Sequence, residues 1–242
     1  MRTLVIVPAF NEAKNLPNVA RALRAHAPGV DVCVVDDGST DGTSEVAASL
    51  GLTVLRLPAN LGIGGAVQTG YLFARDRGYD VAVQIDGDGQ HDPSHLAQVL
   101  APLSDGSADV VIGSRFLEAG GFKSTAARRA GIRYLAWILR LRSGARVTDP
   151  TSGFRAANRR AIEVFARHYP SDYPEPEAIA LATSHQLRLR EVPVRMTERE
   201  HGQSSITALR TLYYLVKVSL AILILPGRGL FTRRVHGAEV SP

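Results

Sequence analysis

The chain has 242 residues, of which 45% are hydrophobic and 21% are charged, and its net charge is +5. This composition is that of an ordinary globular protein, and it excludes a chain that is disordered over most of its length. The length suits one α/β domain with a sizeable core. Cys33 is the single cysteine, so disulfides and cysteine-based zinc sites are excluded, which fits a reducing compartment.

Short runs of Val, Ile and Leu alternate with helical patterns in the first half of the chain. Such runs are typical of parallel strands that are buried on both faces. Strands are predicted over 4–7, 31–35, 53–57, 81–85 and 109–112, and helices over 13–26, 42–50, 64–77 and 93–103. This alternation predicts a doubly wound, mostly parallel α/β sheet, which binds its ligands at the carboxyl ends of the strands.

Two amphipathic helices dominate the prediction for the second half. The elements predicted there are a basic amphipathic helix over 124–142, a loop over 147–155, a helix near 156–167, a strand over 189–195 and an amphipathic helix over 206–225. We therefore expect one domain, 1–205, and a C-terminal helix with a basic tail, 206–242. Because Lys217 interrupts the longest apolar stretch, which is shorter than the roughly 20 residues that span a bilayer, no transmembrane helix is expected.

The positive charge is concentrated in one segment of this second half. Between residues 115 and 160, eleven Lys or Arg residues stand against two acidic residues, Glu118 and Asp149, a local charge of +9. A local excess of this size predicts a phosphate-bearing partner or an anionic membrane surface.

Polar residues follow the first two predicted strands. The run Pro8–Glu12 follows the first strand, which Pro8 should end because proline cannot donate to a ladder. Its Asn and Glu side chains suit either a ligand site or a helix cap. Asp36 and Asp37 follow the second strand. Two adjacent carboxylates repel each other, so we expect a ribose, a base edge or a cation to compensate them, or a turn and helix cap at 39–42.

A glycine-rich segment over 60–66 looks like a dinucleotide fingerprint, but its spacing is wrong. Val67 stands where the third glycine is required, so no nicotinamide or flavin site is expected. The glycines, Gly64 among them, can still let the backbone approach a ligand closely.

The strongest local signal follows the predicted strand 81–85. Asp86 and Asp88 are separated by one glycine, and Gln90 follows them. Two carboxylates at this spacing can turn toward one hard cation, and Mg²⁺ or Mn²⁺ takes oxygen ligands while keeping positions for phosphate oxygens. A surface turn also uses Asp and Gly, but it does not need them directly after a buried strand. We therefore predict a Mg²⁺ or Mn²⁺ site at Asp86, Asp88 and Gln90, with His91 outside it.

These motifs resemble glycosyltransferase family 2, whose members have the GT-A fold. The resemblance extends over about residues 3–225, and its matching segments are 8–12, 34–39 and 86–88, the last as the family's DXD motif. Within the family the sequence is most similar to dolichyl- and polyprenyl-phosphate sugar synthases. Their metal loop is similar to 86–91, their acceptor-phosphate arginine motif to 113–115, and their acceptor-side loop to 151–155.

The resemblance implies an inverting transferase that moves a sugar from a nucleotide-sugar, with a UDP-sugar favoured, to polyprenyl or dolichyl phosphate. No nucleic acid is expected among its partners. The residues then expected to bind the nucleotide-sugar are Pro8, Ala9, Asn11, Glu12, Asp36, Asp37, Gly64 and Asp86. Those expected to bind the acceptor are Arg115, Ser152, Arg155 and Arg199. Those expected to act in catalysis are Asp88 and Arg115, together with Glu177 if the acceptor is a hydroxyl that needs a base.

Two segments depart from the family pattern. The late motif lacks its usual lysine, so Arg199 would have to supply that phosphate contact, and residues 172–177 lack the usual Glu-Phe-Gln-x-Glu pattern. One alternative is a family 2 transferase that acts on a sugar hydroxyl of a lipid-linked or cell-envelope glycan, and another is a binding protein without catalysis. A hydroxyl acceptor needs a general base, for which Glu175 and Glu177 are candidates, whereas a phosphate that is already anionic needs none.

The two predicted amphipathic helices indicate a peripheral protein at the cytoplasmic face of a membrane. Arginines beside an aromatic and aliphatic face, Trp137 included, fit a helix that lies in the membrane interface. Anionic lipids attract such residues by about 1 kcal/mol each. The alternative is that these helices pack on the domain or on a partner, either a small membrane protein or a second copy of the chain.

Overall fold

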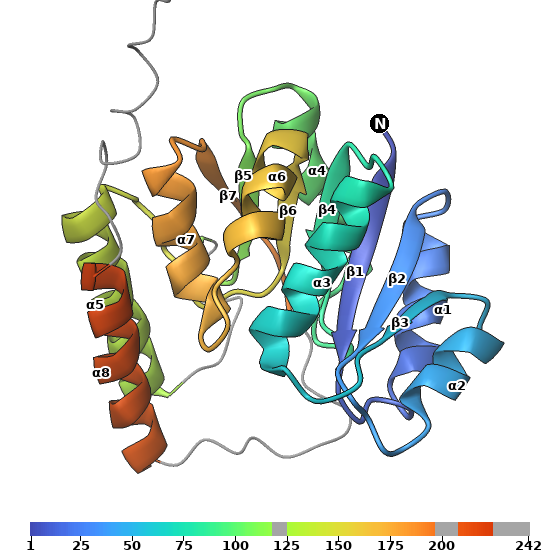
Figure 1. The fold of residues 1–242 in the computed structure, drawn as a ribbon. Helices are drawn as coiled ribbons and strands as arrows, with labels where there is room; N and C mark the ends of the chain where they lie inside the picture. The colour runs from blue at the N-terminus through green and yellow to red at the C-terminus, as the bar shows by residue number, and fades with distance from the viewer. Residues whose placement is uncertain (118–124, 197–207, 225–242) are drawn as a thin grey trace, which may run out of the picture.

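A mixed sheet forms the centre of the molecule, with helices on both of its faces (Figure 1). The structure is a computed structural model that describes residues 1–117, 125–196 and 208–224. Within those residues seven strands pair in the order β3-β2-β1-β4-β6-β5-β7. The strands are β1 (Thr3–Ala9), β2 (Asp31–Asp36), β3 (Thr53–Arg56), β4 (Val81–Gln84), β5 (Val110–Ser114), β6 (Arg155–Asn158) and β7 (Leu189–Pro193).

The helices lie in two layers and at one end of the sheet. Their bounds are α1 (Leu16–His26), α2 (Thr43–Ser49), α3 (Gly62–Asp76), α4 (Leu96–Ser104, after the 3-10 turn Pro93–His95), α5 (Ala126–Ser143), α6 (Arg159–His168), α7 (Pro174–Ser184) and α8 (Ala208–Ile224). One apolar core lies between the sheet and α3 and α6, and a second lies on the opposite face against α1 and α4. The prediction of an α/β sheet buried on both faces is confirmed.

The strands that carry the site are parallel, as predicted. Strand β1 pairs with β2 and with β4 in parallel, so their carboxyl ends meet at one edge of the sheet. The prediction that Pro8 ends the first strand is wrong, because β1 continues to Ala9. The Pro8 carbonyl accepts from the backbone N–H of Gly87 at 3.3 Å, and the Ala9 carbonyl accepts from that of Asp37 at 2.9 Å. Both residues take part through their carbonyl oxygens, so the missing N–H of Pro8 does not end the strand.

Two elements of the second half were not predicted. Residues 155–158 form β6, which pairs antiparallel with both β4 and β5, so the helix predicted from 156 begins at Arg159. Its sequence, Arg-Ala-Ala-Asn, has no apolar alternation that would indicate a strand. Helix α7 was missed because of its prolines, but Pro174 and Pro176 lie in its first turn, where no intrahelical donor is lost.

Helix α8 packs on the rest of the molecule through α5 and α7, beside which it lies in Figure 1. Val218 and Ile222 of α8 are fully buried against Leu135 and Ile138 of α5 and Ile179 of α7. The outer sides of both α5 and α8 carry exposed apolar residues. No helix in the described ranges is long and apolar enough to cross a membrane.

Candidate active site

A cleft of about 280 Å³ lies where the loops after β1, β2 and β4 meet. Its lining is Pro8, Ala9, Phe10, Glu12, Asp37, Asn60, Gly62, Ile63, Ala66, Asp86, Gly87 and Asp88. Six of the predicted site residues are therefore brought together here. Three other predicted donor contacts, Asn11, Asp36 and Gly64, are not in this lining.

The adjacent carboxylates Asp36 and Asp37 are compensated from within the protein. Asp36 accepts from the backbone N–H of Ser39 at 2.8 Å and from the Ser44 hydroxyl. Asp37 accepts from the backbone N–H groups at 61 and 62, at 2.7 and 2.9 Å. Burial raises the pKa of the Asp37 carboxyl. Asp36 is also buried, but the hydrogen bonds from Ser39 and Ser44 outweigh the effect of burial, so the pKa of Asp36 is lowered. The repulsion between the two carboxylates therefore does not require a ligand.

The loop after β1 is tied to the loop after β2. Asn11 has a φ of 58°, in the left-handed region, and its Oδ1 accepts from the backbone N–H of Thr40 at 3.0 Å. Glu12 donates its backbone N–H to the Thr43 hydroxyl at 3.0 Å, and its carbonyl accepts from the first turn of α1. The backbone of Glu12 therefore caps the helix, while the residue lines the cleft, and a contact between Glu12 and a ligand stays a prediction.

Gly64 faces the loop before α7. A Cβ atom at this position would lie 2.2 Å from the Pro170 carbonyl oxygen and 2.3 Å from that of Ser171. The close approach expected at Gly64 is therefore an approach between two parts of the chain, and a contact between Gly64 and the donor stays a prediction.

The metal loop, residues 86–91, carries the two carboxylates of the DXD motif into the cleft. Asp86 Oδ1 accepts from Gln84 Nε2 at 3.1 Å, and Asp88 Oδ1 accepts from the backbone N–H of Gln90 at 3.0 Å. Asp88 is only 6% exposed. The loop folds back on itself because Asp88 binds the N–H two residues later.

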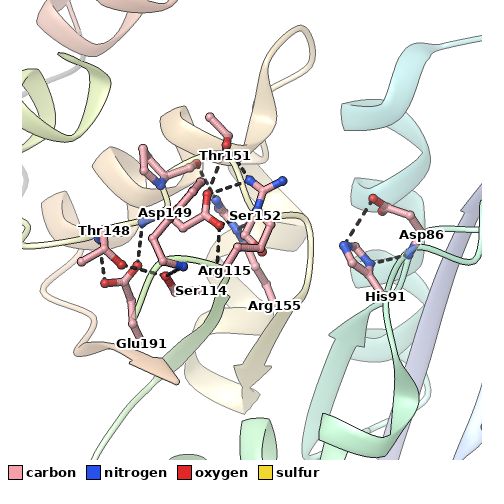
Figure 2. A network of polar contacts seen from close by, with 12 residues as sticks. Asp86, His91, Ser114, Arg115, Thr148, Asp149, Thr151, Ser152, Arg155 and Glu191 are labelled. Atoms are coloured by element: carbon pink, nitrogen blue, oxygen red, sulfur yellow. Dashed lines mark hydrogen bonds and ion pairs between the residues drawn. The ribbon is translucent and has the colours of Figure 1, made fainter. Parts of the chain in front are cut away.

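The acceptor-side arginine motif is buried in an ion pair (Figure 2). Arg115 is 7% exposed, and its Nε and Nη2 donate to the two carboxylate oxygens of Asp149 at 2.6 and 2.7 Å. Its Nη2 also donates to the Thr151 hydroxyl at 2.8 Å. Two backbone N–H groups of this segment, at Thr148 and Asp149, donate to Glu191 of β7. Arg115 thus holds the start of the acceptor-side loop, residues 151–155.

Arg155 is buried beneath the same loop and donates hydrogen bonds to its backbone carbonyls. Its Nε donates to the Ser152 carbonyl at 2.8 Å and its Nη2 to the Pro150 carbonyl at 3.0 Å. The Ser152 hydroxyl is fully buried, and among the described residues it has no hydrogen-bond partner. Arg199, the other predicted acceptor contact, lies outside the described residues.

The chain matches the model of "Glycosyl transferase family 2" over residues 4–165. It belongs to this family. Polyprenol monophosphomannose synthase of Mycolicibacterium smegmatis is 33% identical over 228 residues, which cover 90% of this chain and 86% of that protein. Undecaprenyl-phosphate mannosyltransferase of Micrococcus luteus is 34% identical over 216 residues, 86% of this chain and 88% of that protein.

A third relative carries a different sugar in its name. UDP-N-acetylglucosamine–dolichyl-phosphate N-acetylglucosaminyltransferase of Methanococcus voltae is 31% identical over 220 residues, 83% of this chain and 87% of that protein. Glucosyl-3-phosphoglycerate synthase of Mycobacterium tuberculosis, solved with Mn²⁺ and UDP, superposes with a TM-score of 0.68 at 20% identity, covering 92% of this chain and 78% of that chain. The protein is thus a glycosyltransferase with the GT-A fold.

The oxygen ligands of the metal loop suit a divalent cation, but they do not fill its coordination shell. In the described ranges no group of three or more His, Cys, Asp or Glu side chains could hold a metal. Two carboxylates and the amide oxygen of Gln90 are hard oxygen ligands. A Mg²⁺ or Mn²⁺ ion there would therefore take its other ligands from pyrophosphate oxygens and water.

Of the two candidate bases in α7, Glu175 is the one whose charged neighbours belong to the site. Burial raises the pKa of Glu175, and the charges that act on it next are those of Arg155 and Asp86. Burial also raises the pKa of Glu177, but its charged neighbours are Asp172 and Lys217. Pattern alone could not separate the two glutamates, because they are two residues apart in a segment that was not predicted to be helical.

Proposed function

We propose that this glycosyltransferase transfers a sugar from a nucleotide-sugar, a UDP-sugar first among candidates, to polyprenyl or dolichyl phosphate with inversion at the anomeric carbon. The observation that carries the proposal is the contact between the two halves of the site. The acceptor-side loop packs directly against the DXD motif. A Cβ atom on Gly153 would come within 2.9 Å of Asp86 Oδ2, which shows how close the two segments are. The names of the three relatives support a lipid-phosphate acceptor.

The donor would bind in the cleft, with its pyrophosphate toward Asp86 and Asp88. A divalent cation held there by Asp86, Asp88 and Gln90 would neutralise the departing pyrophosphate. The cleft wall would then take the nucleoside, and its residues there are Pro8, Ala9, Phe10, Glu12 and Asp37. These residues bind and orient the donor, and none of them needs to transfer a proton.

The acceptor phosphate would approach from the acceptor-side loop. It is anionic at neutral pH, because its second pKa is about 6, so it needs cationic positioning in place of a base. Arg115 and Arg155 supply positive charge, and their hydrogen bonds fix the backbone of the loop. Attack on the face opposite the pyrophosphate inverts the anomeric centre, so an α-linked donor gives a β-linked product.

The first experiment measures binding of the nucleotide product with and without metal. Thermal shift with UDP, GDP and dTDP in the presence of Mn²⁺ selects the nucleotide, since a ligand that binds only the folded state raises its stability. Calorimetry then compares wild type with Asp88→Asn, which keeps the volume of this buried residue, and with Asp105→Asn, an exposed aspartate outside the cleft. We expect Asp88→Asn to remove the metal-dependent binding and Asp105→Asn to retain it. Equal binding by all three proteins would contradict the metal assignment.

The second experiment identifies the product. Radiolabelled sugar transferred to polyprenyl phosphate should be released by mild acid, because a sugar phosphodiester at the anomeric carbon is labile. The anomeric coupling in the NMR spectrum of the product should show inversion relative to the donor. An acid-stable product would contradict the phosphate acceptor, and retained configuration would contradict the mechanism.

The second candidate function is transfer to a sugar hydroxyl, and Glu175 is the observation that favours it. A carboxyl whose pKa is raised by burial, beside Arg155 and Asp86, is suited to accept a proton from a hydroxyl. Under this alternative Glu175→Gln abolishes transfer while Glu177→Gln does not. Under the phosphate acceptor both variants keep most of their activity.

The outer face of α5 and α8 supports a location at a membrane surface. We define this apolar face by its exposed residues Tyr134, Trp137, Leu141, Val216, Leu220, Leu223 and Ile224. The Tyr134 hydroxyl accepts from Ser219 of α8 at 3.2 Å, so the two helices present the face together. The arginines of α5 suit anionic headgroups beside an apolar face that enters the interface. We propose that the protein binds the cytoplasmic face peripherally in this orientation.

A further inference from the structure

The Asp86 carboxylate is held between the metal loop and the acceptor-side loop. Figure 2 shows the His91 ring facing Asp86 from within the metal loop. Gly153 of the acceptor-side loop also lies against both carboxylate oxygens and against Gln84, the residue that donates to Asp86 Oδ1. The orientation of this carboxylate therefore depends on two segments that are about 60 residues apart in sequence.

His91 contacts Asp86 with both of its ring nitrogens. Its Nδ1 accepts from the backbone N–H of Asp86 at 3.0 Å, so the proton of the neutral ring is on Nε2. That Nε2 lies 3.7 Å from Asp86 Oδ2. The ring is 4% exposed and stacks on Phe154, with centroids 5.3 Å apart and planes at 27°. His91 thus joins the metal loop to the acceptor-side loop.

Glycine is the only residue type that fits at position 153, between these loops. Its φ is not in the left-handed region, so other residues could adopt its backbone conformation, and only space excludes them. A Cβ atom would lie 2.9 Å from Asp86 Oδ2 and 3.2 Å from Gln84 Nε2. The next residue, Phe154, accepts through its carbonyl from the backbone N–H of Gly113 at 2.8 Å. The same short segment thus contacts the DXD motif and the end of β5.

We propose that His91 and Gly153 are positioning residues that set the Asp86 carboxylate for metal-dependent nucleotide binding and couple it to the acceptor-side loop. The proposal rests on the proposed function, since it requires a divalent cation at the DXD motif. A displacement of the acceptor-side loop then changes the metal site through Gly153 and through the stack of Phe154 on His91. Acceptor binding and donor binding are coupled by this contact.

The test is a Mn²⁺ titration of nucleotide binding by calorimetry, with the nucleotide that stabilises the wild type most. Groups that orient a metal ligand typically change metal affinity by 10- to 100-fold when replaced, so we expect Gly153→Ala to raise the half-saturating Mn²⁺ concentration by about tenfold. Nucleotide binding without metal should not change. Gly131→Ala on α5 is the matched control, because its Cβ would meet only Leu215 at an ordinary 3.7 Å.

Two variants of His91 separate its hydrogen bond from its stacking. His91→Phe keeps a ring against Phe154 but has no acceptor for the Asp86 N–H, and it should raise the half-saturating Mn²⁺ concentration by about tenfold. His91→Asn supplies an oxygen near the Nδ1 position and should bind Mn²⁺ better than His91→Phe. In the double variant His91→Phe/Gly153→Ala the effect should be smaller than the product of the single effects, because both act on one carboxylate.

Each outcome decides one proposal. Wild-type Mn²⁺ dependence in Gly153→Ala and His91→Phe would overturn the positioning role, as would equal losses of binding with and without metal. Effects that multiply in the double variant would overturn the shared route through Asp86. If the wild type itself showed no metal-dependent nucleotide binding, the proposed function would fall first.

Discussion

The donor side and the acceptor side of this glycosyltransferase hold their charges in different ways. On the donor side, carboxylates at strand ends are compensated by backbone N–H groups of nearby loops, and Asp37, Asp86 and Asp88 still line the cleft. On the acceptor side, Arg115 and Arg155 are buried and hydrogen-bonded to groups of their own loop. Carboxylates therefore form the wall of the donor cleft, whereas the arginines first determine the shape of the loop that receives the acceptor.

The reason lies in the chemistry of the two charges. A carboxylate accepts several N–H bonds from the backbone and remains ionised. A buried guanidinium needs carbonyl or carboxylate acceptors, because its desolvation costs several kcal/mol. The comparison predicts that changes on the acceptor side affect stability as well as transfer, whereas changes in the metal loop mainly affect binding.

The largest effect is expected at Asp149. Asp149→Ala leaves the buried Arg115 guanidinium without its ion pair, which should lower the free energy of unfolding by about 3–5 kcal/mol. Urea unfolding followed by circular dichroism measures it. The matched control is Asp172→Ala, since Asp172 pairs with Lys217 at the surface and should contribute less than about 1 kcal/mol. Similar values for the two variants would remove the distinction drawn for the acceptor side.

Arg115→Lys should lower transfer about 100-fold, equal to about 2.7 kcal/mol of barrier. Lysine keeps the charge but cannot make the two parallel bonds to Asp149 that hold the loop. Radiolabelled transfer to polyprenyl phosphate measures the loss, and nucleotide binding without metal should be nearly unchanged. Glu177→Gln is the control, and it should keep its activity. A nearly silent Arg115→Lys together with an inactive glutamate variant would favour the hydroxyl acceptor.

A smaller effect is expected at lipid surfaces, where the single tryptophan is a built-in reporter. Trp137 is 57% exposed on the apolar face, so its fluorescence should shift to shorter wavelength when vesicles containing anionic lipid are added. Leu141→Ser should weaken binding about tenfold, or about 1.4 kcal/mol, because it removes a large apolar side chain from the contact. Leu61→Ser, at an exposed residue of the donor side, should bind as wild type does. No shift with either neutral or anionic vesicles would contradict the membrane orientation.

The smallest effect concerns acid stability. Hydrogen bonds from Arg188 hold the pKa of the buried Asp109 carboxyl well below its usual range. Because the folded-state pKa is lowered, Asp109 stabilises the fold above about pH 4 and this contribution is lost as pH falls further. Asp109→Asn should be less stable at pH 7 by about 1 kcal/mol, since Arg188 is largely exposed, and the difference should shrink toward pH 2. Urea unfolding across this range measures it, and a constant difference would refute the assignment.

Sequence alone determined the donor side well. The parallel strands were predicted because fully buried strands are continuous in Val and Ile, a local property of the chain. The DXD motif was predicted to lie at the carboxyl end of β4 because topology places all such ends at one edge. Prediction failed locally at Pro8, where the neighbours of β1 extend the strand. The turn at Ser39 does bind Asp36, but the partners of Asp37, at 61 and 62, come from a loop that the local sequence does not indicate.

The acceptor side was decided by tertiary structure. Four residues became β6 because β4 and β5 offered unpaired edges on both sides, not because of their own pattern. The sequence does not distinguish His91 from an ordinary loop histidine, because Phe154, on which its ring stacks, is distant in sequence. Glu175 was separated from Glu177 only by its charged neighbours, Arg155 and Asp86, which come from distant parts of the chain. Local periodicity and spacing are properties of short segments, whereas the partner of a buried charge or ring is a residue distant in sequence, which only the folded chain brings into contact.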